Sequence, residues 1–305
     1  MKTKEELAAR IAALKKEKNA IILAHYYCTD EVQALADHVG DSFYLAKVAK
    51  ETDAAVIVFC GVSFMGESAK ILNPEKTVLM PDLHADCAMA HMAEVERIKE
   101  MRAKYPGLAV VCYINSTAEL KRHSDVCVTS SNAVRIVRAL PNRDIYFIPD
   151  QNLGRFVKEQ VPEKNVMLCD GYCPIHKALT ADQVLAKKRE YPEALVLTHP
   201  ECTGEVLALS DYVGSTADII RYAKESEADC FIVCTEVGVA YRLRQDNPQK
   251  RFVFCDPCPC CADMKLNTPE KIEEVLSSGK NAVEVSEEKR AGALVPLDRM
   301  LELAK

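Results

Sequence analysis

Three stretches of this chain align without a gap: ILAHYYCTDEVQALADHVGDS at residues 22–42, VVCYINSTAELKRHSDVCVTS at 110–130 and VLTHPECTGEVLALSDYVGST at 196–216. The copies are separated by 88 and 86 residues. A threonine, a glutamate and an aspartate recur at matching positions: Thr29, Thr117 and Thr203; Glu31, Glu119 and Glu205; Asp37, Asp125 and Asp211. An aspartate at the far end of each copy keeps the same separations: Asp82, Asp170 and Asp256. Agreement at both ends indicates an internal repeat, which sets the architecture.

Short apolar runs alternate with helical patterns along the whole chain. Nine of these runs are typical of strands: 20–25, 54–60, 76–82, 108–113, 143–150, 164–170, 194–199, 229–234 and 251–256. They are apolar on both faces, as in buried parallel sheets. We therefore predict an α/β fold of three repeated α/β/α three-layer domains with short parallel sheets, related by pseudo-threefold symmetry. The expected boundaries are residues 1–87, 88–173 and 174–261, followed by a C-terminal helical segment, 262–305, that packs back on the first repeat.

The composition and charge limit the classes of protein to which this chain can belong. The 305 residues are 49% hydrophobic and 28% charged, which is typical of a globular protein. A net charge of -6 argues against a general nucleic-acid-binding protein, because such a protein needs a basic face. Residues 1–19 form a charged helical pattern without the apolar stretch of a signal peptide, and no apolar run reaches membrane-spanning length. We expect a cytoplasmic protein, whose 14 cysteines are free, metal-binding or catalytic rather than disulfide-bonded.

Polar pairs end the first strand of each copy: His25 with Tyr27, Tyr113 with Asn115, and His199 with Glu201. Seventeen residues after the first member of each pair stands a hydroxyl: Ser42, Ser130 or Thr216. Ligands of open α/β sheets bind beyond the carboxyl ends of the strands, so we expect one shared site. Each hydroxyl directly precedes a helical pattern and is expected to be an N-cap, where the helix end would attract a carboxylate or phosphate. Capping alone is the commoner role for a single hydroxyl, but the repetition favours a pocket.

One cysteine follows the last strand of each copy: Cys87, Cys173 and Cys261. Symmetry would bring the three thiolates together, and such soft ligands suit an iron–sulfur cluster or zinc. Three ligands on a four-iron cluster leave one iron open, which is typical of a catalytic metal. Most of the remaining cysteines lie in or beside apolar strands and are predicted to be small buried hydrophobes: Cys28, Cys60, Cys112, Cys127, Cys169, Cys202, Cys230 and Cys234.

Two alternatives use only the third copy. Cys255, Cys258 and Cys261 form C-x2-C-x2-C, which suggests a local iron–sulfur carrier or sensor, but Lys265 stands where a ferredoxin would have its fourth cysteine. Cys255 and Cys258 could instead be a redox pair or inert thiols. The residues His199, Glu201, Cys258 and Cys261 fit H-x-E…P-C-x-x-C, the pattern of a zinc-dependent deaminase-type hydrolase. His84 and His176 each lie three residues from a ligand cysteine, and each could contact the site or orient its neighbours.

Several motifs together resemble the quinolinate synthase family, the iron–sulfur enzymes of de novo NAD biosynthesis. They span nearly the whole chain in order: ILAHYY, GVSFMGESAKIL, PDLHADCAMA, CYINSTAELK, DGYCPIH, LTHPEC, VGSTA and CCADMKLNT. The family's H-N-Y start reads His25-Tyr26-Tyr27 here, so only its middle residue differs. The resemblance implies condensation of iminosuccinate (iminoaspartate) with dihydroxyacetone phosphate to quinolinate, phosphate and water. It also implies L-aspartate oxidase as the source of iminosuccinate.

The same resemblance assigns the residues. It implies one [4Fe-4S] cluster per chain, held by Cys87, Cys173 and Cys261, whose open iron acts as a Lewis acid. It gives acid–base work to Tyr27 and Glu201. Apart from the resemblance, ring closure and two dehydrations need a proton shuttle, which Tyr27 with His25 and His199 could supply. The positions that match its substrate contacts are His25, Ser42, Tyr113, Ile114, Asn115, Ser130, His199, Pro200, Glu201 and Thr216.

Overall fold

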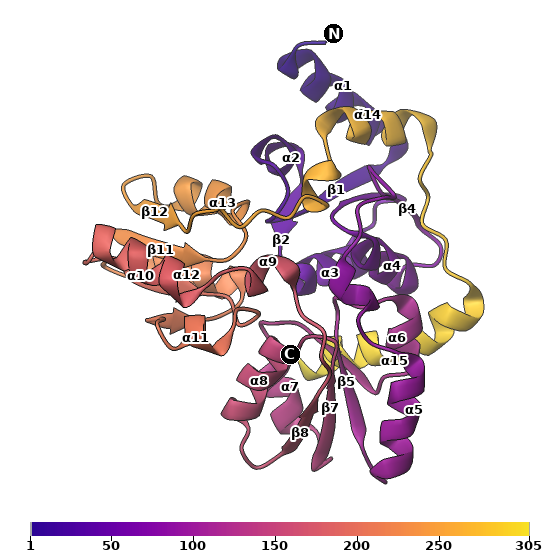
Figure 1. The fold of residues 1–305 in the computed structure, drawn as a ribbon. Helices are drawn as coiled ribbons and strands as arrows, with labels where there is room; N and C mark the ends of the chain where they lie inside the picture. Colours follow the sequence, from indigo (N-terminus) through magenta and orange to yellow (C-terminus); the bar gives the residue numbers. More distant parts are fainter. Residues whose placement is uncertain (1, 305) are drawn as a thin grey trace.

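The computed structural model describes residues 2–304 and contains three four-stranded parallel sheets, one for each copy of the repeat (Figure 1). Their strand orders are β2-β1-β3-β4, β6-β5-β7-β8 and β10-β9-β11-β12. The same order recurs in each sheet, with the first strand of each copy in the interior and flanked by the next two. The predicted α/β class with three repeated parallel-sheet units is confirmed.

The first unit carries the N-terminal helix and sheet one. Its elements are α1 (Lys4–Lys18), β1 (Ala20–His25), α2 (Asp30–Leu35), β2 (His38–Gly40), α3 (Ser42–Glu51), β3 (Val56–Cys60), α4 (Ser63–Leu72), β4 (Thr77–Leu79) and the 3-10 turn η1 (Ala88–His91). Helix α1 begins at Thr3, whose side chain and Glu6 form a capping box. Its apolar residues pack on one face of the sheet, in a cluster that includes Leu7, Ile11 and Leu14.

The second and third units repeat this plan. The second contains α5 (Val95–Lys104), β5 (Ala109–Tyr113), α6 (Ala118–Arg122), β6 (Val126–Val128), α7 (Ala133–Ala139), β7 (Asp144–Ile148), α8 (Gln151–Gln160) and β8 (Asn165–Leu168). The third contains α9 (Pro174–Lys177), α10 (Ala181–Glu190), β9 (Leu195–Thr198), α11 (Gly204–Leu207), β10 (Tyr212–Val213), α12 (Thr216–Glu225), β11 (Cys230–Cys234), α13 (Val239–Asp246) and β12 (Arg251–Phe254). In Figure 1 the three units surround α9, which lies near the centre of the view.

The C-terminal segment divides between two units. After the 3-10 turn η2 (Met264–Leu266), helix α14 (Pro269–Ser278) packs on α1 and also contacts α2 and β3 of the first unit. Helix α15 (Glu287–Leu303) instead packs on α6 and β6 of the second unit, with contacts to α4 and α7. Figure 1 shows these two positions, α14 beside α1 and α15 beside α6. The C-terminal segment therefore contacts the first unit mainly through α14 and the second unit mainly through α15.

Each sheet also contains one very short strand that the sequence analysis does not name. These strands are β2, β6 and β10, and each pairs with the first strand of its unit. A run of two or three residues shows no alternation or length that separates it from a loop. The repeated aspartates explain where these short strands lie. One aspartate directly precedes each of them and accepts the N–H of a residue in the first strand of its unit: Asp37, Asp125 and Asp211.

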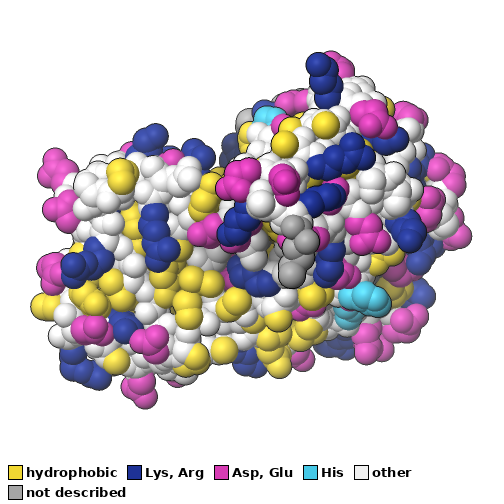
Figure 2. All heavy atoms as spheres, turned by 90° about the horizontal axis from the view of Figure 1, so that it is seen from above, with side chains coloured by type: hydrophobic (Ala, Val, Ile, Leu, Met, Phe, Trp, Pro, Cys, Tyr) yellow, Lys and Arg dark blue, Asp and Glu magenta, His cyan; other side chains and the backbone are white. Residues whose placement is uncertain are grey.

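Charge is mixed over the visible surface. Figure 2 shows Lys and Arg interspersed with Asp and Glu, without a continuous basic face on the side that is drawn. None of the helices among residues 2–304 is both long and apolar enough to cross a membrane. The eight strand-associated cysteines are all buried and free, as predicted.

Candidate active site

The three units share one cavity at the carboxyl ends of their strands. Most of the predicted site residues line it, although they come from all three copies: His25, Tyr27, Ser42, Tyr113, Asn115, Ser130, His199, Glu201 and Thr216, together with Cys87, Cys173 and Cys261. Parallel strands direct their carboxyl ends to one edge of a sheet, and here three such edges meet. The polar set and the three thiols therefore face one enclosed space.

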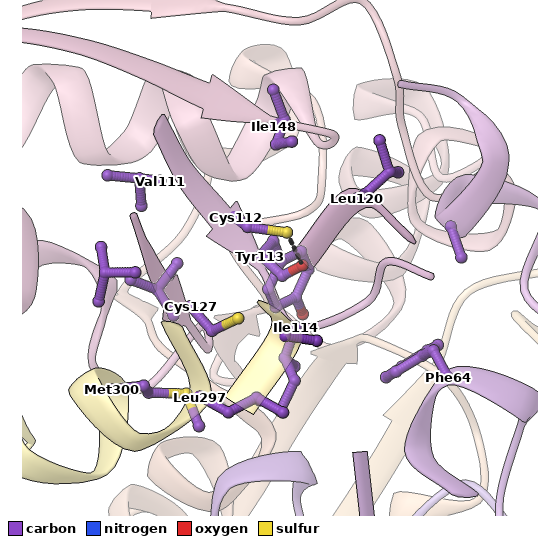
Figure 3. Packing of buried hydrophobic residues seen from close by; sticks show 14 of the residues in the cluster. Phe64, Val111, Cys112, Tyr113, Ile114, Leu120, Cys127, Ile148, Leu297 and Met300 are labelled. Atoms are coloured by element: carbon purple, nitrogen blue, oxygen red, sulfur yellow. Dashed lines mark hydrogen bonds between the residues drawn. The ribbon is translucent and has the colours of Figure 1, made fainter. Parts of the chain in front are cut away.

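Two of the proposed substrate positions, Ile114 and Pro200, do not line this cavity. Ile114 is 1% exposed, and Figure 3 shows it within the core cluster that also contains Leu297 of α15. The reason is the alternation of an extended chain: Tyr113 and Asn115 face the cavity, so the residue between them faces the opposite way.

The prediction that the repeated hydroxyls cap the following helices is wrong. Asp41 caps α3 by accepting the N–H of Tyr44 at 2.9 Å, and Ser215 caps α12. Ser42 and Thr216 are instead the first residues of these helices, and Ser130 lies two residues before Asn132, the N-cap position of α7. Two adjacent polar residues precede each helical run, and the sequence pattern does not say which one caps. The hydroxyls at Ser42 and Thr216 are thereby available to the cavity.

The two histidines at the strand ends share one hydrogen-bond pattern. His25 Nδ1 accepts the N–H of Tyr27 at 3.2 Å, and His199 Nδ1 accepts the N–H of Glu201 at 3.3 Å. Because Nδ1 accepts, the proton of each neutral ring lies on Nε2. His199 Nε2 then donates to Ser130 Oγ at 3.2 Å. Burial lowers the pKa of both His25 and His199 to about 3, so both rings are neutral N–H donors at neutral pH.

A continuous hydrogen-bonded chain joins Glu201 to Tyr27. Glu201 Oε2 lies 2.7 Å from His176 Nδ1, and His176 Nε2 lies 2.9 Å from Thr235 Oγ1. Thr235 Oγ1 lies 2.8 Å from the hydroxyl of Tyr27, which in turn lies 2.8 Å from Thr216 Oγ1. Each bridging group can donate and accept, so the chain can carry a proton between a carboxylate and a phenol.

The electrostatics assign different protonation states to the ends of this chain. Burial opposes ionisation of Glu201, but its electrostatic interaction with His176 and the hydrogen bonds from His176 and Tyr113 outweigh that effect, and the pKa of Glu201 lies below its usual range. Burial, together with the nearby Glu201 charge, raises the pKa of Tyr27 and Tyr113 well above the usual value. Glu201 is therefore a carboxylate, and both tyrosines keep their protons.

The amide of Asn115 also indicates a ligand. Its Oδ1 is inaccessible to solvent and has no hydrogen-bond partner among the described residues, and Asn115 lines the cavity. A buried acceptor without a donor costs free energy. A bound molecule with an N–H or O–H group would satisfy it.

The three predicted ligand cysteines fit a positively charged group. Burial raises the pKa of Cys87 to about 12, and it also raises the pKa of Cys173 and Cys261 above the usual thiol value. Thiolates at these positions need a compensating cation, which a metal centre supplies. Cys87, Cys173 and Cys261 belong to different units and all face the cavity, so the donor set suits a group that is larger than one ion.

A single-ion site could form only from a different set among the described residues. Cys173, His176 and Glu201 have ligand atoms within 4.8 Å of one another. His176 thus lies at the site, whereas His84 is exposed and does not line the cavity. Cys258, which the zinc alternative needs, is exposed and absent from the cavity wall. The geometry therefore does not favour the deaminase-type arrangement.

Several polar residues in or beside the cavity had no place in the sequence prediction, among them Asp86, Thr235 and Glu236. Thr235 and Glu236 directly follow β11. The rule that chemistry gathers after the carboxyl ends of strands could have identified them. The repeated polar pairs follow the first strand of each copy, whereas these two residues follow the third strand of the last copy.

Comparison with known proteins agrees over the whole chain. A family model described as Quinolinate synthetase A protein matches residues 9–302. A protein from Fusobacterium nucleatum named quinolinate synthase is 52% identical over 295 residues, which cover 97% of this chain and 98% of the relative. Proteins of the same name from Caldicellulosiruptor saccharolyticus (49% over 300 residues; 98% and 99% covered) and Clostridioides difficile (48% over 301 residues; 99% and 99%) are similar to a comparable degree. The chain belongs to the quinolinate synthase family of enzymes.

Proposed function

We propose that this enzyme condenses iminosuccinate with dihydroxyacetone phosphate to form quinolinate, phosphate and water, as a step of NAD biosynthesis. The observation that carries the proposal is the single cavity where Cys87, Cys173 and Cys261 meet the polar residues of all three units. Family membership supports the same activity.

The three cysteines would hold one [4Fe-4S] cluster per chain. When bound, the cluster would supply an open iron that acts as a Lewis acid. The remaining chemistry is derived from the side chains. Removal of a proton from carbon beside a carbonyl or imine needs a base, and the ionised Glu201 is suited to this role.

Loss of water and phosphate needs proton donors within reach of the leaving groups. Tyr27 keeps its proton and is linked through Thr235 and His176 to Glu201. A proton taken up at Glu201 can therefore be returned at Tyr27 without passing through bulk water. His199 Nε2–H offers a second donor beside Ser130.

The anionic groups of the substrates have matching donors. Helices α3 and α12 begin at the cavity with Ser42 and Thr216, and their free N–H groups and dipoles favour carboxylate or phosphate. The neutral His25 and His199 add N–H donors, and Asn115 offers an unpartnered oxygen to a hydroxyl or imine. Both substrates would arrive in the cytoplasm, with L-aspartate oxidase as the source of iminosuccinate.

The test compares iron and sulfide content and quinolinate formation in the wild type, Cys87→Ala and Cys258→Ala, all purified without oxygen. We expect about four irons per chain in the wild type and in Cys258→Ala, and loss of both cluster and activity in Cys87→Ala. Zinc that survives Cys87→Ala but not Cys258→Ala would instead support a zinc hydrolase built on the third unit, and would overturn the proposal.

A further inference from the structure

Each of the three ligand cysteines donates its backbone N–H to a carboxylate. The pairs are Cys87 with Asp86 Oδ1 at 2.8 Å, Cys173 with Asp150 Oδ2 at 3.1 Å, and Cys261 with Glu236 Oε1 at 3.0 Å. Asp150 and Glu236 are fully buried. A carboxylate is costly to bury unless its oxygens are well satisfied, so three such pairs around one cavity require an explanation.

The carboxylates follow the repeat in the second and third units and depart from it in the first. Asp150 and Glu236 stand 86 residues apart, and each lies two residues after the third strand of its unit, β7 or β11. The matching residue of the first unit is the apolar Val62. There, Asp86 provides the carboxylate from beside the cysteine, and it accepts a hydrogen bond from Ser63, the residue after Val62. The arrangement is thus retained although a different segment supplies it.

Every other partner of the two buried carboxylates is a donor as well. Asp150 Oδ1 accepts the N–H of Leu153 at 2.7 Å. Glu236 Oε2 accepts the N–H of Gly238 at 2.7 Å, and its Oε1 also contacts Lys265 Nζ at 2.9 Å. An amide of the same shape would place an NH₂ group against one of these donors. Asparagine or glutamine therefore breaks one contact without changing the packing volume.

Glu236 joins the ligand loop to the acid–base residues. Lys265, which stands where a ferredoxin would have its fourth cysteine, binds Glu236 and donates to the backbone oxygen of Tyr27 at 2.5 Å. One buried carboxylate of the third unit thus fixes Cys261 and, through Lys265, the backbone of Tyr27 in the first unit. A displacement of Glu236 would move both groups.

We propose that Asp86, Asp150 and Glu236 are positioning residues for the metal ligands, which set how firmly the cysteine loops hold the cluster. The inference rests on the proposed function, since it needs a cluster at Cys87, Cys173 and Cys261. Hydrogen bonds to the residues that bear metal ligands orient them, and their loss weakens metal binding. Because Glu236 also restrains Lys265 and Tyr27, its replacement affects the cluster most.

The experiment follows transfer of iron to the ferrous chelator bathophenanthroline disulfonate, anaerobically and well below the melting temperature. Wild type is compared with Glu236→Gln, Asp150→Asn and Asp86→Ala, the last because an asparagine at position 86 would keep the oxygen that accepts the Cys87 N–H. Asp211→Asn is the control, because Asp211 holds strand β9 of the third unit and does not touch a ligand. We expect iron release about tenfold faster in Glu236→Gln, a smaller acceleration in the other two test variants, and no change in the control.

The outcomes separate the two proposals. A wild type that binds no cluster contradicts the proposed function, and this inference with it. A wild-type cluster with equal release rates in all variants contradicts the inference alone. Asp86 is partly exposed, so Asp86→Ala removes the acceptor of the Cys87 N–H without disturbing the core and keeps the test open if a buried variant fails to fold. If Asp211→Asn released iron as fast as Glu236→Gln, the faster release would reflect general destabilisation of the fold, and the inference would be overturned.

Discussion

One hydroxyl lies in the path between Tyr27 and Glu201, the two residues to which we assign acid–base roles. Thr235 is fully buried, and its Oγ1 lies between His176 Nε2 and the hydroxyl of Tyr27. A hydroxyl can donate to one neighbour and accept from the other, which is what transfer of a proton along the chain requires. The Thr235 hydroxyl therefore completes the hydrogen-bonded path along which Glu201 and Tyr27 can exchange a proton. Without that hydroxyl the two residues would act separately.

Replacing Thr235 with valine keeps the shape and removes this connection. We expect Thr235→Val to retain the iron content of the wild type but to form quinolinate about a hundredfold more slowly, because proton transfer contributes rate factors of that order. Thr235→Ser restores the hydroxyl and should recover most of the rate. Steady-state quinolinate formation with a visible spectrum checks both. A wild-type rate in the valine variant would mean that Tyr27 and Glu201 do not communicate through Thr235.

At the scale of the secondary-structure element, the repeated aspartates stabilise the pairing of strands within each sheet rather than the site. Asp125 Oδ2 accepts the N–H of Val110 at 2.6 Å and also binds Arg102 at 2.8 Å. The N–H of Asp125 donates in turn to the Val110 oxygen at 2.9 Å. This pair of contacts fixes the start of the short strand β6 against β5, and the same contacts recur at Asp37 and Asp211.

Loss of one such aspartate should reduce stability without changing chemistry. We expect Asp125→Ala to lower the free energy of unfolding by about 1–3 kcal/mol, because the N–H of Val110 loses its acceptor. Asp125→Asn keeps an oxygen acceptor and should cost less. Denaturant unfolding measures both, with quinolinate formation as the check on the site. A changed KM in Asp125→Ala at full cluster content would show that the aspartate reaches the cavity.

The first and second units share a hydrophobic core, and the third unit is joined to them differently. One continuous hydrophobic cluster includes residues of the first and second units and of α15, whereas the sheet of the third unit has its own two clusters. Polar contacts join the third unit to the first: Gln33 Nε2 donates to the Gly238 oxygen at 3.0 Å, and the Tyr27 hydroxyl lies 2.8 Å from Thr235 Oγ1. At this contact between the first and third units, a Cβ on Gly238 would lie 2.7 Å from the backbone of Tyr27.

We therefore expect Gly238→Ala to force the first and third units apart. Overpacking of this kind costs about 1–3 kcal/mol, and here it should also slow quinolinate formation because Tyr27 moves. Gly204→Ala is the control in the same unit, since its Cβ would meet only the far end of the Arg155 side chain at 3.3 Å. Thermal melting and turnover test the pair. Equal melting temperatures and turnover in the two variants would mean that the contact between the first and third units tolerates the extra methyl group.

The sequence alone determined the parts that repeat or depend on local pattern. Nine strands followed from apolar runs, and the three units followed from separations that the chain itself displays. The polar residues after the first strands were identified because position along a strand fixes direction in a sheet. Strands β2, β6 and β10 were missed, since two or three residues carry too little pattern.

Only the tertiary structure decided how the copies meet. It placed Ile114 in the core, moved the caps of α3 and α12 to Asp41 and Ser215, and linked Tyr27 to residues of the third unit through Thr235. The hydrogen bond between Tyr27 and Thr235 spans 208 residues of chain. Contacts of that kind depend on the relative placement of whole sheets, and no local period or spacing in the sequence encodes that placement.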